Sequence, residues 1–290
     1  MTLALALAAL VVACRTPDVR SVSERYVGAD AGAAGREPET VLIPAGPFLM
    51  GTNDQQAVRI LGIGGEDWEE YLGWQQPQHE VYLSAYRIGR YPVTNMEYWA
   101  FVRATGHEPP RSWPSSVFED GTANRPVGFV TYADAVAYCE WLSRATGKRY
   151  RLPTEAEWEK AARGTDGRFY PWGDDWSPDL LNSKEAGPGH LTDVGTYSPG
   201  GDSPYTVADM AGNLWEWTSD WFSPTEYADR ADKRVTDPSG PSSGKMRVIR
   251  GGAFNLDGIL LGHTGVRDHS APNNVAIDDG FRVVLESGDD

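Results

Sequence analysis

The stretch from Asp209 to Trp221 constrains the fold of this chain more than any other segment. It reads Asp-Met-Ala-Gly-Asn-Leu-Trp-Glu-Trp-Thr-Ser-Asp-Trp and holds three of the 11 tryptophans. The tryptophans alternate with Glu216, Thr218 and Asp220, and such alternation of bulky and polar residues predicts a half-buried β-strand. The Gly-Asn pair predicts a tight turn before this strand.

Asp209 and Glu216 flank the Gly-Asn turn. A tight turn there can bring both carboxylates and its own carbonyl oxygens together, and this is the type of ligand set that calcium prefers. The alternative is that both carboxylates accept backbone N–H groups within the turn. The spacing alone leaves both interpretations open.

The bulk composition indicates a globular protein with many turns. The chain has 290 residues, 40% hydrophobic and 23% charged, with 32 glycines and 20 prolines. This length allows one large domain, and the Gly and Pro content favours long ordered loops over a helical bundle. The formal net charge is -15 and no basic stripe is present, so nucleic acid is not expected as a partner.

The N-terminus has the pattern of an export signal. Residues 3–13 form an apolar run that ends at Cys14; a membrane-spanning helix needs about 20 residues, so the run is typical of a signal-peptide core. Val11-Val-Ala-Cys14 resembles a lipobox, which predicts lipidation of Cys14 and a membrane anchor on the cell envelope. No Lys or Arg precedes the run, and the alternative is a secreted protein with an incidental cysteine. The expected organisation is a signal peptide over 1–13, a lipidated flexible tether over 14–39, one domain over 40–286 and an acidic tail over 287–290.

Apolar alternation and the positions of Gly and Pro predict the first elements of the domain. The expected order is two strands within 41–51, a surface loop with a short helix over 53–78, strands at 81–83 and 86–90, a helix capped by Thr94 or Asn95, and a Pro-rich loop over 108–126.

A second helix is expected from Thr131 as N-cap, with Asp134 at its third position, to Gly147. Its buried stripe should contain Ala135, Tyr138, Cys139 and Leu142. No cysteine besides Cys14 and Cys139 is present, so the domain should contain no internal disulfide. The apolar setting of Cys139 predicts a structural residue and not a catalytic thiol.

A third helix is expected to begin within residues 151–158, with Pro153 in its first turn. Glu155 and Glu157 would complement the helix dipole there. Because these two residues are two apart, they do not face each other on a helix, which disfavours a paired acid/base role.

Several motifs together resemble one family, that of the formylglycine-generating enzymes (sulfatase-modifying factors). They occur in the order seen in that family and span about residues 40–285: Phe48-Leu-Met-Gly51, Tyr91-Pro-Val-Thr-Asn95, Pro126-Val-Gly-Phe-Val130, Arg151-Leu-Pro-Thr-Glu-Ala-Glu-Trp158, Tyr170-Pro-Trp-Gly-Asp174, Asp209 to Trp217, Arg247-Val-Ile-Arg-Gly-Gly252 and Gly280-Phe-Arg282. So many ordered motifs make chance similarity improbable.

The resemblance implies a fold and two calcium sites. The expected fold is an α/β (α+β), C-type-lectin-like core with long irregular loops. The family's calcium site matches Asp209, Gly212, Leu214 and Glu216, with Asp209 where well-studied members carry Asn. A second site would begin at Asn182 and Ser183, but the loop with its remaining ligands is shortened here.

The resemblance also locates the family's catalytic centre, in which two cysteines bind Cu(I). Soft thiolates are the ligands that suit Cu(I). In this chain those two positions align with Leu256 and Leu261, and an active-site serine position aligns with Ala253. Leucine cannot bind copper or form a mixed disulfide, so copper-dependent formylglycine generation is not expected.

A rearranged metal site is a second hypothesis. His263, Asp268 and His269 provide the two histidines and one carboxylate of a non-haem iron site. The family's iron-dependent relatives, however, take ligands from an additional helical domain, and the alternative is that these are surface-loop histidines. Trp215, Arg267, His263 and His269 are candidates for a shared pocket.

The sequence therefore predicts an envelope lipoprotein that acts as a calcium-braced binding module for an envelope protein, a peptide or a glycan. Its loops contain Trp68, Trp74, Trp113, Trp172 and Trp176, which could line a pocket or belong to the core. The alternatives are an oxidoreductase that uses iron or another metal, and a structural subunit of an envelope complex.

Overall fold

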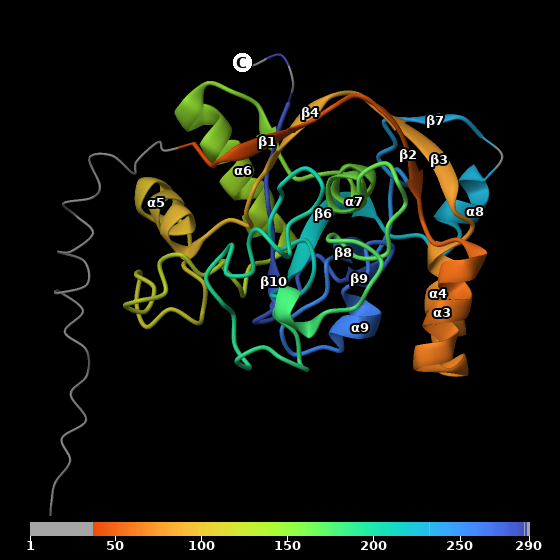
Figure 1. Ribbon diagram of the computed structural model, residues 1–290. Helices are drawn as coiled ribbons and strands as arrows, with labels where there is room; N and C mark the ends of the chain where they lie inside the picture. The colour runs from red at the N-terminus through yellow and green to blue at the C-terminus, as the bar shows by residue number, and fades with distance from the viewer. Residues whose placement is uncertain (1–36, 232, 287, 289–290) are drawn as a thin grey trace, which may run out of the picture.

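A computed structural model of the chain describes residues 37–231, 233–286 and 288. They form three small β-sheets with helices packed around them (Figure 1). The predictions about Cys14, the signal peptide and most of the tether lie outside the described residues. The strands are β1 (Thr40–Ile43), β2 (Gly46–Met50), β3 (His79–Leu83), β4 (Tyr86–Gly89), β5 (Tyr150–Arg151), β6 (Trp215–Trp221), β7 (Val235–Thr236), β8 (Arg247–Arg250), β9 (Asp268–Ser270), β10 (Asp279–Gly280) and β11 (Val284–Leu285).

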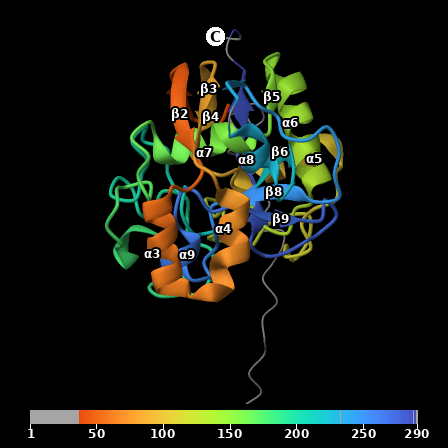
Figure 2. The same ribbon diagram turned by 90° about the vertical axis from the view of Figure 1, so that its right-hand side faces the viewer.

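The helices are short and mostly lie at the outside of the sheets (Figures 1 and 2). The α-helices are α3 (Asp54–Gly64), α4 (Glu69–Gln75), α5 (Asn95–Thr105), α6 (Tyr132–Thr146), α7 (Glu155–Arg163), α8 (Glu226–Arg230) and α9 (Gly258–Leu261), and the 3₁₀ helices are η1 (Glu66–Trp68) and η2 (Pro178–Leu180). Within the described residues, no helix has both the length and the apolar character that crossing a bilayer requires.

The first sheet joins the two ends of the domain. Its strand order is β1-β4-β11-β5, and all neighbouring strands are antiparallel. β1 pairs Thr40 with Gly89, while β11 pairs Val284 with Ile88, so the first and last strands lie on opposite sides of β4. This pairing fixes the Gly280-Phe-Arg282 segment, which directly precedes β11, in the middle of the domain.

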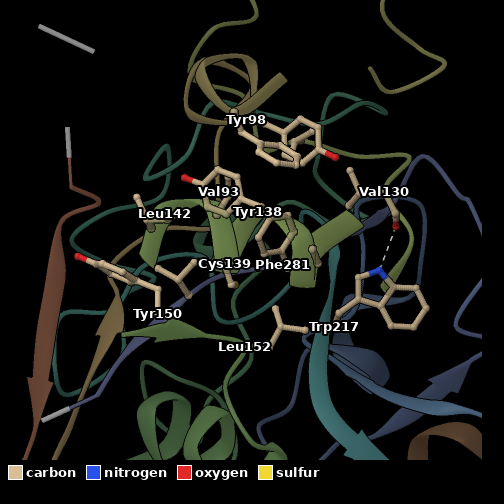
Figure 3. Packing of buried hydrophobic residues seen from close by; sticks show 14 of the residues in the cluster. Val93, Tyr98, Val130, Tyr138, Cys139, Leu142, Tyr150, Leu152, Trp217 and Phe281 are labelled. Atoms are coloured by element: carbon tan, nitrogen blue, oxygen red, sulfur yellow. Dashed lines mark hydrogen bonds between the residues drawn. The ribbon is translucent and has the colours of Figure 1, made fainter. Parts of the chain in front are cut away.

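The second sheet has the order β10-β6-β8-β9, and the Trp-rich strand β6 lies inside it. The prediction of a half-buried strand was wrong in one respect, because the polar residues Glu216 and Thr218 are as buried as the tryptophans. Helix α7 packs against one side of β6, and Trp217 enters the main aromatic core, where its Nε1–H donates to the carbonyl of Val130 (Figure 3). Thr218 Oγ1 donates to the carbonyl of Val248, so its burial leaves no hydroxyl unpaired.

Residues 53–78 form two α-helices and a 3₁₀ turn, not the predicted surface loop with one short helix. Asn53 accepts from the N–H of Gln56, whose side chain accepts from the N–H of Asn53, and this capping box starts α3. Ile60 of α3 and Leu72 of α4 are buried in a small apolar cluster with Phe169 and residues of α9. Contacts from distant segments therefore stabilise helices that the acidic local sequence does not indicate.

The prediction for α6 is confirmed. Thr131 accepts from the N–H of Asp134, and Gly147 ends the helix with φ of 75°. Ala135, Tyr138, Cys139 and Leu142 are all buried, and Figure 3 shows Cys139 among apolar neighbours. Burial raises the pKa of the Cys139 thiol, which makes it an inert core residue.

Helix α7 lies between the β2-β3-β7 sheet and the sheet of β6 and β8, and all nine of its residues are buried. The helix begins at Glu155 after the N-cap Thr154, so Pro153 precedes the cap and does not lie in the first turn. Glu157 closes the cap and pairs with Arg151 at 2.7 Å. A helix that is both charged and fully buried requires partners for its charges.

Arginines from the C-terminal part of the chain supply those partners. Arg267 donates to both oxygens of Glu155 at 2.7 and 2.8 Å. Arg250 bridges Glu155 and Glu159, with N–O distances of 3.0 and 2.6 Å. Burial alone would raise the pKa of Glu155, but the charges of Arg267 and Arg250 outweigh it and hold that pKa below its usual value.

We expect Glu155→Ala to destabilise the domain by about 3–5 kcal/mol, because the buried Arg267 loses its carboxylate contacts and Arg250 keeps only its pair with Glu159. Urea unfolding at neutral pH measures this loss. The matched control is Glu140→Ala on the surface of α6, where the pair with Arg144 is exposed and worth at most about 1 kcal/mol. Equal small losses for the two variants would show that the buried pairs do not hold the layers together.

Candidate functional site

The Gly-Asn turn before β6 has an unusual backbone. Asp209, Gly212 and Asn213 have φ values of 56°, 73° and 66°, in the left-handed region that most side chains avoid. Asn213 tolerates this region, and its side chain is fixed by hydrogen bonds from Asn182 Nδ2 and from the N–H of Thr192. The turn is therefore held in a single conformation by its surroundings.

Asp209 is a buried carboxylate with few partners. Within the described residues its side chain accepts one hydrogen bond, from the N–H of Gly195 to Oδ2 at 2.7 Å. Burial raises the pKa of Asp209 to about 6, and the bond from Gly195 and the charge of Arg282 only partly offset this. A bound cation is one way to relieve such a group.

Glu216, in contrast, is already paired. Arg282 donates from Nε and Nη2 to its two oxygens, both at 2.6 Å, and the indole N–H of Trp158 donates to Oε2 at 2.8 Å. A carboxylate offers about four lone-pair positions. One lone-pair position on Glu216 Oε1 is left, and the carbonyl of Gly212 already accepts from the N–H of Leu214. Asp209, Glu216 and the carbonyls of Gly212 and Leu214 are oxygen donors of the kind that calcium prefers.

The structure brings the second candidate calcium site next to the first. Asn182 and Gly212 form a parallel β-bridge, and the N–H of Asn213 donates to the carbonyl of Asn182. Asn182 Nδ2 has two acceptors, but the buried Oδ1 has no donor. Ser183 Oγ donates to Glu185 at 2.6 Å. Among the described residues, Asn182 Oδ1 is therefore a buried oxygen without a donor, and no three His, Cys, Asp or Glu side chains gather around it as a metal site.

The two positions matched to the copper cysteines lie in apolar surroundings. Leu256 and Leu261 are partly buried and pack against the main core, and Ala253 is buried beside them. Gly252 allows this packing, because a Cβ there would lie 2.5 Å from the carbonyl oxygen of Leu261. Among the described residues, the sole free cysteine is the buried Cys139.

The four residues predicted to share a pocket lie in different surroundings, although Arg267 and His269 both contact Phe222. Trp215 and Arg267 are interior residues, the first in the core and the second paired with Glu155. His263 is also buried and stacks on Phe169, and His269 is half-buried against Phe222. Three of the four candidates therefore serve the interior of the fold.

The histidines do not form the facial triad considered above. His263 Nδ1 accepts from the N–H of Gly265, and burial lowers the pKa of its ring well below the usual value. His269 Nδ1 lies 3.7 Å from Oδ1 of Asp268, its neighbour on β9. In the part of the chain that the structure describes, no three His, Cys, Asp or Glu side chains gather as a metal site.

A cavity of about 180 Å³ lies against the main core at Trp113. Its residues come from four separate segments of the chain: Asn95, Ser112, Trp113, Glu119, Thr122, Arg125, Pro126, Gly128, Phe129, His190, Leu191 and Ile277. Of the predicted loop tryptophans, Trp113 lies in this wall. The Pro126–Val130 motif marked the segment, but no local signal indicated that Leu191 and Ile277 would meet it.

Comparison with known proteins finds a matching family model and several similar sequences. The sulfatase-modifying factor enzyme 1-like domain matches residues 28–287. The formylglycine-generating enzyme of Streptomyces coelicolor is 33% identical, over 89% of this chain and 94% of that enzyme. The hercynine oxygenase of Mycolicibacterium smegmatis is also 33% identical, over 79% of this chain and 58% of that protein.

Among solved structures, PvdO from Pseudomonas aeruginosa superposes with a TM-score of 0.70 at 28% identity. The match covers 89% of this chain and 96% of PvdO. The predicted α/β, C-type-lectin-like fold of the formylglycine-generating-enzyme type is confirmed.

We expect protonation of the buried Asp220 to make the free energy of unfolding depend on pH. Burial raises its pKa to about 7, so between pH 8 and pH 5 the folded state takes up a proton that the unfolded state, with a pKa near 4, does not. Asp220 therefore adds stability as the pH falls through about 7. His79 and His263, whose pKa values are lowered, oppose this trend below about pH 6.5.

The difference in unfolding free energy between wild type and Asp220→Asn isolates this group. It should shift in favour of the wild type by a few kcal/mol as the pH falls from 8 to 5, measured by urea unfolding at each pH. Exposed Asp179→Asn is the control and should show no such shift. A pH-independent difference for Asp220→Asn would contradict the assignment.

Proposed function

The chain belongs to the sulfatase-modifying factor enzyme 1-like family, and from this we propose that it is a ligand-binding member without copper–thiol chemistry. One observation carries the proposal. The positions matched to the copper cysteines are Leu256 and Leu261, which pack against the core, while the thiol of Cys139 is buried elsewhere. Without an accessible thiolate pair, neither Cu(I) binding nor exchange with a substrate cysteine has a donor.

Calcium is the second part of the proposal. The buried and poorly partnered carboxylate of Asp209 would hold the ion with Glu216 and the carbonyls of Gly212 and Leu214. The ion would supply positive charge to a left-handed turn that otherwise buries Asp209 against Glu216. Its role would be to brace the turn, and the loops that pack on it, for ligand binding.

The sequence pattern at Cys14 supports a proposed location on the cell envelope. A lipid on Cys14 would anchor the domain to a membrane of the cell envelope, with residues 15–39 as the tether. The ligand would then be an envelope protein, a peptide, a glycan or a small molecule. The acidic net charge of -15 supports an exported, non-nucleic-acid role.

One set of relatives favours a second candidate, a metal-dependent oxidoreductase. Two hercynine oxygenases are 33% and 34% identical to this chain, which spans just over half of each. His263, Asp268 and His269 are the residues that such a function would draw on. The geometry supports it less well, because His263 stacks on Phe169 inside the core and its Nδ1 already accepts from the N–H of Gly265.

We expect calcium to raise the melting temperature of the wild-type protein relative to the chelator EGTA, since an ion that binds only the folded state stabilises it. Asp209→Gly should abolish the increase, because it removes the carboxylate while glycine keeps the φ of 56°. Thr206→Gly, at another non-glycine residue with positive φ, is the control and should respond to calcium as wild type does. An unchanged response in Asp209→Gly would place the ion elsewhere.

Elemental analysis separates the two candidate functions. The full-length chain, purified without added metal and without a metal-binding tag, should contain about one calcium and no stoichiometric copper or iron. Near-stoichiometric iron or copper that is lost in His263→Ala or His269→Ala would instead establish the oxidoreductase and overturn the binding-domain proposal.

A further inference from the structure

The lining of the cavity of about 180 Å³ combines apolar and polar residues. Trp113 and Phe129 are its aromatic walls, and Leu191 and Ile277 complete it. The indole N–H of Trp113 donates to Asn95 Oδ1 at 3.2 Å, so its polar atom is already bonded and the ring offers apolar contact. Ile277 is 42% exposed, an unusual position for a large aliphatic side chain that belongs to a wall.

Phe129 is held in its wall by a strained backbone. Its φ is 58°, a value that costs a bulky L-residue about 1–2 kcal/mol. The N–H of Phe129 donates to the carbonyl of Ala276, and Gly128 lets the two segments approach, since a Cβ there would lie 2.2 Å from the carbonyl oxygen of Ile277. The guanidinium of Arg111 lies 4.9 Å from the ring centroid. Strain that the surroundings enforce in this way is a recognised feature of ligand clamps.

Charges of both signs lie among the lining residues. Arg125 and Glu119 both line the cavity, and within the described residues no ion pair or side-chain hydrogen bond engages either one. His190 adds a third polar group, its Nδ1 bonded to the carbonyl of Leu191. Glu119 is exposed and Arg125 is half-buried, so both charged groups are free to contact a ligand in the cavity.

We propose that this cavity binds a zwitterionic α-amino acid with one ring-sized apolar side chain, of the phenylalanine type. The ring would lie between Trp113 and Phe129, the carboxylate would face Arg125 and the ammonium group would face Glu119. An apolar cavity of about 150 Å³ is known to accept benzene, so the volume suits one ring. The proposal rests on the proposed function, because it names the ligand class of a binding domain.

Isothermal titration of the full-length chain with four probes tests this assignment. L-Phenylalanine should bind best, 3-phenylpropionate (no ammonium) and phenethylamine (no carboxylate) should each bind about tenfold more weakly, and L-alanine, which lacks the ring, should not bind measurably. Equal binding of the first three probes, or no binding of L-phenylalanine, would overturn the proposal.

Three variants assign the contacts. Arg125→Gln should weaken the binding of L-phenylalanine about tenfold but leave that of phenethylamine unchanged. Glu119→Gln should also weaken the binding of L-phenylalanine about tenfold but leave that of 3-phenylpropionate unchanged. Phe129→Gly should abolish binding while the fold is kept, because glycine adopts the φ of 58° without strain. The controls are Arg144→Gln on exposed α6 and Thr206→Gly, both with wild-type binding. Uniform effects of both charge variants on all probes would count against the assignment.

Titration and elemental analysis together separate a wrong ligand class from a wrong proposed function. If no probe binds while elemental analysis finds calcium without a redox metal, the ligand class is wrong and the binding domain stands. If stoichiometric iron or copper is found, the proposed function fails whatever the titration shows.

Discussion

The buried ion pairs between α7, β6 and three arginines of the C-terminal part of the chain hold the layers of this domain together. Taking one such charge out of water costs several kcal/mol, which only close, well-directed partners repay. Arg250, Arg267 and Arg282 meet that condition, each with two N–H groups on buried carboxylates. Arg250 and Arg282 belong to motifs that carry the family resemblance. Those motifs therefore contain residues that stabilise the fold, and they can be present in a chain that has leucines at the positions of the copper-binding cysteines.

The same pairing links the framework to the candidate calcium turn. Arg282 holds Glu216 from one side, and its Nη2 also donates to the carbonyl of Ala208, next to Asp209. The turn is thus anchored at both of its ends by one guanidinium group. Asp209 is the carboxylate with fewer hydrogen-bond partners. Because Arg282 already holds the turn, a calcium ion at Asp209 would bind to a turn whose conformation is formed without it. The ion would then add stability without creating the fold.

How much the sequence could predict depends on the range of the interactions. The caps at Thr94, Thr131 and Thr154 act over three residues, and the helices that they start were predictable. Only one short helix was predicted where α3 and α4 lie, because their apolar residues meet Phe169 and α9, far along the chain. Strand β6 was predicted, but its full burial was not, since the partner of Glu216 lies 66 residues away. For the site, the turn residues could be predicted individually, whereas the contact of Asn182 with Gly212 and the cavity at Phe129 required the three-dimensional arrangement.

Among the described residues, charged side chains form ion pairs in the interior of the domain but not at the cavity, and this difference supports the cavity as the place where a ligand binds. In the interior, the arginines of the ion-pair network have carboxylates at hydrogen-bonding distance, and strained turns are fixed by side chains. At the cavity, Arg125 and Glu119 line the same space without pairing to any described residue, and Phe129 keeps a strained φ that places its ring in the wall. The contact of Arg111 with the ring of Phe129 and the hydrogen bond from Phe129 N–H to Ala276 hold that ring in place. A ligand with separated charges and one apolar ring would therefore meet a wall that is already formed, and forming the wall would cost it no binding energy.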